Sequence, residues 1–233
     1  MNVEIFPDGT TVAKKAAQFI AAQARAAVAE RGLFTLAVSG GHTPWQMLRL
    51  LATEDVPWKG VHLFQVDERV APAGDKDRNL THLKESLLGT VKLLSGQVHA
   101  MPVEDKDLVA AAARYAKELE SIAGSPPVLD LVHLGLGPDG HTASLVPRDK
   151  SLDVTNTDVT LSGPYQGHLR MTLTYPVLDR ARTILWLISG PDKVPMFTRL
   201  QKGDRTIPAG RVRSDHALVF ADAAAAGPVA GRA

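Results

Sequence analysis

We expect the chain to be organised around the segment Leu129–Pro147, LDLVHLGLGPDGHTASLVP. It starts within a mostly apolar run, residues 128–136, that has the length and composition of a buried strand. A turn with three glycines follows, and residues 141–145 then read as the start of a short helix or an ordered loop. Because glycine has no Cβ and accepts positive φ, such a turn lets the backbone approach a ligand closely. Asp139 and His141 therefore form a titratable pair at the exposed rim of a sheet, where a catalytic base is useful.

The same turn formally matches the dinucleotide fingerprint GxGxxG at 135–140, but its context argues against nucleotide binding. The motif lies in mid-chain, Pro138 stands inside it, and no acidic residue clearly ends a second strand at the expected distance. A structural turn whose histidine only caps or packs is the other alternative. The adjacent acid and two hydroxyl residues favour a functional site instead. We expect His133, within the strand, to be a satisfied core histidine and not a metal ligand.

Length and composition limit the class of protein. A chain of 233 residues with 45% hydrophobic content can bury a full core, and we expect one domain over residues 1–220 with a disordered tail at 221–233. The net charge of +1 argues against a nucleic-acid partner. The chain has no cysteine, no signal-peptide layout and no apolar run of the roughly 18 to 20 residues that span a bilayer. We therefore expect a cytoplasmic protein without a membrane partner, and the histidine and carboxylate spacings predict no metal site.

Strands and helices alternate along the sequence. The patterns predict strands at 2–6, 33–38, 61–66, 128–136, 170–174 and 183–188. They predict helices at 11–31, from about 44 to 51, at 79–88, at 107–123 and from about 193 to 201. Residues 148–167 read as short strands or loop. This alternation predicts an α/β fold with a largely parallel sheet flanked by helices.

Polar groups follow several of these strands. The segments 33–45, 129–145 and 183–197 each read as a strand, a small-residue turn and a helix. In a parallel sheet such turns meet at the carboxyl edge, where ligands bind. We therefore expect the loop Ser39–Thr43, the pair Asp67 and Arg69, the pair at 139 and 141, and Lys193 to converge.

The chemistry expected at this edge is that of a small anion. Two of the turns lead into helix N-termini, whose free N–H groups and positive dipole end favour phosphate. Arg170 and Lys193 would add charge-assisted hydrogen bonds. The residues alone thus predict a phosphorylated or carboxylated ligand beside a histidine base.

A serine esterase is the rival interpretation. The sequence AVSGG at 37–41 is a loose variant of the nucleophile elbow, and Asp192 and His216 complete a Ser…Asp…His order. However, the elbow requires glycine where Ala37 stands, and the turn at 139–141 is left without a role. A hydroxyl on an anion-binding loop explains Ser39 equally well.

Five motifs together resemble the 6-phosphogluconolactonase family: SGGHTP at 39–44, DERVAP at 67–72 with Asn79, LGLGPDGHTASLVP at 134–147, RMTLT at 170–174 and SGPDK at 189–193. The resemblance covers roughly residues 33–200. It implies a carboxylic ester hydrolase that converts 6-phospho-D-glucono-1,5-lactone to 6-phospho-D-gluconate, the second step of the oxidative pentose phosphate pathway, without a metal or organic cofactor. It also implies the fold shared with glucosamine-6-phosphate deaminases and ribose-5-phosphate isomerases, with the sugar lactone as partner. We expect a monomer or small homo-oligomer.

The resemblance also assigns roles to individual residues. His141 matches the general base that deprotonates water, and Asp139 matches the acid that orients it. Asp67 and Arg69 match the pair at the lactone end, where Arg69 would stabilise the oxyanion. The phosphate would be held by residues matching the family's loop and cations: Ser39, Gly40, Gly41, Thr43, Arg170 and Lys193. His42 occupies a variable position and receives no role.

Two related functions remain as alternatives. Amino-sugar phosphate deaminases of similar sequence carry DEY where this chain has DER at 67–69, and they place a glutamate where this chain has Val146. Sugar-phosphate-binding effector domains share the fold but normally accompany a DNA-binding helix-turn-helix. Residues 1–32 offer one long helix with no basic recognition helix after it.

Overall fold

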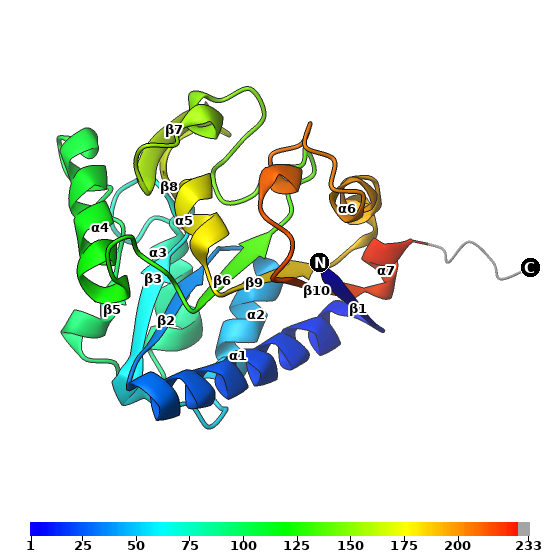
Figure 1. Cartoon of the computed structure of the whole chain (residues 1–233), viewed down its shortest axis with the longest axis horizontal. Helices are drawn as coiled ribbons and strands as arrows, with labels where there is room; N and C mark the ends of the chain where they lie inside the picture. The colour runs from blue at the N-terminus through cyan, green and yellow to red at the C-terminus, as the bar shows by residue number, and fades with distance from the viewer. Residues whose placement is uncertain (228–233) are drawn as a thin grey trace, which may run out of the picture.

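Seven parallel strands form a sheet through the centre of the molecule (Figure 1). The structure is a computed structural model and describes residues 1–227. The strand order is β1-β10-β9-β6-β2-β3-β5. The strands are β1 (Asn2–Phe6), β2 (Phe34–Val38), β3 (Val61–Gln65), β5 (Val98–His99), β6 (Leu131–Gly135), β9 (Thr183–Ile188) and β10 (Ala217–Asp222). The predicted α/β fold with a largely parallel sheet is confirmed.

Both faces of this sheet are covered by helices. The helices are α1 (Gly9–Arg31), α2 (His42–Leu51), α3 (Asn79–Leu83) with a π-helical turn Lys84–Leu88, α4 (Leu108–Ala123), α5 (Tyr175–Arg180), α6 (Val194–Gln201) and α7 (Ala223–Ala226). Their ends follow local chemistry. The Asp8 side chain accepts a hydrogen bond from the Thr11 amide at 2.7 Å and begins α1. Gly32 ends it with φ of 73°, a conformation that glycine adopts without strain. No helix of residues 1–227 is long and apolar enough to cross a membrane.

The alternation of side chains along each strand divides the core into two clusters. Phe34, Leu36 and Val38 of β2 pack with the alanine-rich face of α1 and with α2. Ala37 points to the other face, where it joins the cluster that contains α4, α5 and α6. The two clusters pack on opposite faces of the same sheet. The polar turns that follow the strands lie between them, at the carboxyl edge of the sheet.

A second sheet lies beside that edge and was not predicted. It is antiparallel, with the order β4-β8-β7, and consists of β4 (Asp67–Arg69), β7 (Val159–Tyr165) and β8 (His168–Leu173). The expected strand near 170–174 therefore exists but is not part of the parallel sheet. Val66 joins the two sheets, because its amide donates to the Val38 carbonyl while its own carbonyl accepts from the Leu173 amide.

Two further expectations are corrected. Residues 141–145 form an ordered loop with a short bridge between Thr142 and Leu145, which confirms the loop alternative and corrects the expectation of a helix after the middle turn. The disordered tail predicted from residue 221 begins too early, because Ala221 and Asp222 extend β10 and the following α7 buries Ala225 at 1% exposure. The rest of the predicted tail, residues 228–233, lies outside the described residues.

Candidate active site

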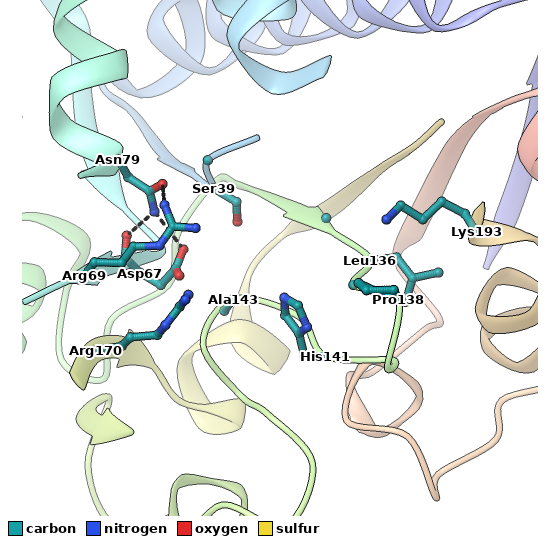
Figure 2. Close-up of a pocket in the computed structure, with 13 residues that line it drawn as sticks. Ser39, Asp67, Arg69, Asn79, Leu136, Pro138, His141, Ala143, Arg170 and Lys193 are labelled. Carbon is teal, nitrogen blue, oxygen red and sulfur yellow. Dashed lines mark hydrogen bonds between the residues drawn. The ribbon is translucent and has the colours of Figure 1, made fainter. Parts of the chain in front are cut away.

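A cavity of about 220 Å³ opens at the carboxyl edge of the parallel sheet, where the second sheet meets it (Figure 2). Figure 2 shows the side chains of Arg69, Asp67 and Arg170 on one side, Lys193 on the other and His141 between them. The lining residues are Ser39, Gly40, Asp67, Arg69, Asn79, Gly135, Leu136, Gly137, Pro138, His141, Ala143, Arg170 and Lys193.

Three of the residues singled out in the sequence lie outside the cavity lining. Asp139 does not line the cavity, but it is hydrogen-bonded to His141, which does. Gly41 is the N-cap of α2, with φ of 131°, and Thr43 lies in the first turn of that helix. The structure thus brings the other seven together around one cavity and gives these three supporting positions.

His141 and Asp139 form a hydrogen-bonded pair. The Nδ1 atom of His141 lies 2.6 Å from Asp139 Oδ1, and the same oxygen accepts the His141 amide at 3.1 Å. Burial raises the pKa of Asp139, but hydrogen bonds from His141 and Tyr165 outweigh it and hold the pKa below its usual value. The carboxylate is therefore ionised and accepts a hydrogen bond from Nδ1–H, which leaves Nε2 as the basic nitrogen of the neutral imidazole.

The imidazole fits only because residue 137 is glycine. A Cβ on Gly137 would lie 2.1 Å from both Nδ1 and Cε1 of His141. The Gly137 amide also donates to the His141 carbonyl at 2.9 Å, which closes the turn. The glycine-rich turn thus packs its own backbone against the histidine ring.

Asp67 is held in a buried network at the start of β4. It is 4% exposed, and its Oδ2 accepts the Ser144 hydroxyl at 2.6 Å. Asn79 donates from Nδ2 to Asp67, at 2.9 Å to the carbonyl and 3.3 Å to Oδ1. The Asn79 Oδ1 atom in turn accepts from Arg69 Nη1 at 2.5 Å. The amide of Asn79 therefore connects the carboxylate to the guanidinium, a role that sequence spacing did not reveal.

Arg170 is a buried cation on β8. It is 3% exposed, and its Nε and Nη2 atoms each donate to the Tyr165 carbonyl at 3.3 Å. Burial and the nearby Arg69 lower its pKa from the ordinary arginine value. A guanidinium with so little water around it binds an anion strongly. Lys193, at the end of the 3-10 turn before α6, pairs with Asp192 at 2.9 Å.

Ser39 is fixed to the neighbouring strand β6. Its hydroxyl donates to the His133 carbonyl at 3.0 Å, and its amide donates to His133 Nδ1 at 3.2 Å. A serine hydroxyl engaged with a carbonyl lacks the histidine base that an esterase nucleophile needs. His216, the triad partner in the esterase interpretation, pairs instead with Asp215 at 2.9 Å. The geometry does not support the esterase.

His133 is a core histidine, but it is only half satisfied. It is fully buried, and burial lowers its pKa to about 3, so the ring is neutral. Its Nε2 atom has no hydrogen-bond partner among the described residues, which corrects the expectation of a fully satisfied side chain. Within residues 1–227, no group of three or more histidine or carboxylate side chains is arranged to hold a metal ion.

A parallel sheet with a cationic cavity at its carboxyl edge is typical of α/β proteins that bind small anionic ligands. Comparison with known proteins narrows this class. The chain belongs to the family of glucosamine-6-phosphate isomerases/6-phosphogluconolactonase, whose sequence model matches residues 7–220.

Several members of this family resemble the chain over most of its length. The 6-phosphogluconolactonase of Nostoc sp. is 32% identical over 97% of both chains, and that of Mycobacterium tuberculosis is 37% identical over 82% of both. The crystal structure of 6-phosphogluconolactonase from Thermotoga maritima superposes with a TM-score of 0.85 at 28% identity, covering 95% of this chain and 98% of that one. A monomeric glucosamine-6-phosphate deaminase has the same fold, with a TM-score of 0.83 at 20% identity over 97% and 99% of the two chains.

Proposed function

We propose that this protein is a carboxylic ester hydrolase that converts 6-phospho-D-glucono-1,5-lactone to 6-phospho-D-gluconate in the pentose phosphate pathway. The observation that carries the proposal is the His141–Asp139 pair, whose basic Nε2 belongs to a ring that lines a cavity with three cations. The names of the relatives in Nostoc and Mycobacterium support the same activity.

The chemistry needs one proton relay. Nε2 of His141 takes a proton from water as the water oxygen attacks the lactone carbonyl carbon. The tetrahedral oxyanion then collapses, the ring C–O bond breaks, and the imidazolium returns the proton to the leaving oxygen. A positioned general base contributes about 10²–10⁴-fold to the rate. We assign the role of oxyanion donor to Arg69, and one such donor contributes about 10²–10³-fold.

The phosphate end of the substrate requires fixed donors. We assign Arg170 and Lys193 to the phosphate, together with the Ser39–Gly40 backbone. Arg170 supports this assignment because its guanidinium is desolvated and lines the cavity. Gly41 and Thr43 would set the shape of the loop at the start of α2. Binding energy gained at the phosphate can then orient the distant carbonyl for attack.

Asp67 receives a positioning role in this scheme. Both of its carboxylate oxygens already accept hydrogen bonds, from Ser144 and Asn79. A carboxylate engaged in this way is a poor competitor for the proton of water. It holds Asn79, and through Asn79 it holds the oxyanion donor Arg69.

Amino-sugar deamination is the second candidate, because a deaminase shares the fold. The resembling deaminases use a glutamate where this chain has Val146, which is 5% exposed and apolar. The site thus lacks that carboxylate, which favours the lactonase over the deaminase. A sugar-phosphate-binding effector domain would need no base, whereas here the imidazole is held by Asp139.

The remaining properties follow from the lactonase. We propose a single domain without metal or organic cofactor, acting as a monomer or small homo-oligomer in the cytoplasm. The two clusters of core residues lie on opposite faces of one sheet, which favours one domain. The lack of cysteine suits a reducing compartment.

A coupled assay tests the function. Glucose 6-phosphate is oxidised to fresh lactone, and 6-phosphogluconate is followed after subtraction of spontaneous hydrolysis. We expect wild type to accelerate hydrolysis and His141→Ala to lose at least about 10²-fold. His216→Ala is the matched control, because this histidine lies at the opposite end of β10 from the carboxyl edge. Equal activity of wild type and His141→Ala would show that another residue is the general base. If wild type does not accelerate hydrolysis, the proposed lactonase activity is refuted.

A further inference from the structure

Tyr165, which sequence reasoning did not single out, contacts the histidine pair directly. Its hydroxyl donates to Asp139 Oδ2 at 3.0 Å, and the hydroxyl oxygen lies 3.3 Å from His141 Nδ1. Its ring also meets the imidazole edge to face, with centroids 5.2 Å apart and planes at 67°. Each oxygen of the Asp139 carboxylate thus has its own partner: Oδ1 is hydrogen-bonded to His141, and Oδ2 accepts from Tyr165.

The same residue contacts the buried arginine of the cavity. The Arg170 guanidinium carbon lies 5.1 Å from the centroid of the Tyr165 ring, within the range of a cation–π interaction. The Tyr165 carbonyl accepts two hydrogen bonds from that guanidinium, each at 3.3 Å. Tyr165 thus touches both the base and one of the cations assigned to the phosphate.

The hairpin of β7 and β8 explains how one residue reaches both. Tyr165 ends β7 opposite His168, across a two-residue turn at Gln166 and Gly167 with φ of 50° and 83°. The strand register shifts between Ser162 and Tyr165, while Ser162 stays opposite Arg170. The tyrosine therefore lies beside Arg170 of the facing strand, outside the cavity lining but in contact with two residues, His141 and Arg170, that line it.

We propose that Tyr165 is a positioning residue that fixes the Asp139–His141 pair through its hydroxyl and holds Arg170 with its ring. The proposal rests on the lactonase function. The hydroxyl holds Oδ2 and so hinders the Asp139 carboxylate from rotating away from Nδ1. The ring proton of His141 therefore stays on Nδ1, and Nε2 remains unprotonated. The phenol stays protonated for this role, because burial and the adjacent Asp139 raise its pKa.

Two variants separate the hydroxyl from the ring. Tyr165→Phe keeps the ring over Arg170 and removes the donor, so we expect kcat to fall about tenfold with KM nearly unchanged. Tyr165→Leu also removes the aromatic ring, so KM should rise about threefold or more in addition. The matched control is Tyr175→Phe, which removes a hydroxyl that donates to the Pro208 carbonyl at 2.9 Å and not to Asp139.

A double-variant cycle tests whether the hydroxyl acts through Asp139. In the Asp139→Ala background, Tyr165→Phe should lower kcat by less than about twofold, because the side chain that accepts the hydroxyl is gone. An equal tenfold loss in both backgrounds would show that the hydroxyl acts independently of Asp139 and would overturn the proposal. Unchanged kcat in Tyr165→Phe would overturn it as well.

Nitrogen NMR provides a readout that does not depend on activity. The His141 ring nitrogens, assigned by comparison with His141→Gln, should show the Nδ1–H tautomer in wild type and a larger share of Nε2–H in Tyr165→Phe. If wild type fails to hydrolyse lactone but the tautomer shifts in this way, the lactonase is refuted and the positioning role is retained. An identical tautomer in both proteins refutes the positioning role even where lactonase activity is found.

Discussion

Glu68 is fully buried between Asp67 and Arg69 on β4, and its replacement by glutamine tests how strongly its carboxylate stabilises β4. Its carboxylate forms an ion pair with buried Arg78, whose Nε lies 3.2 Å from Oε2. It also accepts four hydrogen bonds of 2.8–2.9 Å, from Gln65 Nε2 and from the amides of Arg69, Asn79 and Leu80. Two elements of the site, β4 and the start of α3, are therefore tied to one carboxylate.

The size of the effect follows from the arrangement of these donors. Oε1 accepts two amides and Oε2 accepts one amide and Gln65, so an NH₂ group at either position would face two donors. Removing one partner of a buried ion pair costs about 3–5 kcal/mol. Arg78 keeps Glu104 at 2.9 Å, so we expect the lower value, about 3 kcal/mol. With a urea m-value of about 3 kcal/mol per M, the midpoint should fall by about 1 M.

Urea unfolding followed by tryptophan fluorescence measures this shift. Glu104→Gln is the matched control, because it removes the other partner of Arg78 but its side chain is 56% exposed. A solvent-exposed ion pair of this kind contributes at most about 1 kcal/mol. If Glu68→Gln shifts the midpoint no more than Glu104→Gln, the buried carboxylate does not organise this part of the site.

Two further predictions concern the loop at Ser39. His133 stays neutral down to a pKa of about 3, whereas the unfolded chain takes up its proton near 6.5, so the stability of the native state falls as pH drops between these values, by about 2 kcal/mol at pH 5. His133→Asn keeps an acceptor for the Ser39 amide. Between pH 7 and pH 5, its free energy of unfolding, measured with urea, should fall by about 2 kcal/mol less than that of wild type. An equal fall in both proteins would contradict the neutral histidine. Gly40→Ala would place a Cβ 1.9 Å from Asn79 Oδ1, so kcat/KM should fall about 10²-fold, whereas Gly96→Ala, which meets nothing within 4 Å, should leave kcat/KM unchanged. Full activity of Gly40→Ala would show that Asn79 can move without loss.

The parallel sheet was predictable because its central strands are continuous apolar runs separated by amphipathic helices. The second sheet was not, since Asp67–Arg69 is too short for any periodicity and pairs with residues 170–172, far away in the sequence. The edge strand β5 has only two residues and gives no signal either. β10 was missed where its apolar end runs into the alanines of α7 and reads as low complexity.

The candidate site was predictable to a similar degree. Residues on glycine turns after strands, such as Ser39 and His141, carry a local signal that sequence reasoning can use. Asn79 and Tyr165 act through partners that only the tertiary fold supplies, Asp67 in one case and Asp139 in the other. No spacing rule connects residue 165 to 139, because their contact depends on the β7–β8 hairpin.

The position of β1 has a consequence for how the chain reaches its native state. Within residues 1–227, residues 2–6 pair only with residues 218–222 of β10, so this edge strand cannot pair until nearly all of the described residues have been synthesised. Closing so long a loop costs conformational entropy, about (3/2)RT ln n, before any contact is gained. During synthesis, Asn2–Phe6 therefore has no partner strand until β10 is made, whereas β2 and β3, which are close in the sequence, can pair much earlier. Chaperones that bind short extended segments would find this strand available until translation reaches β10.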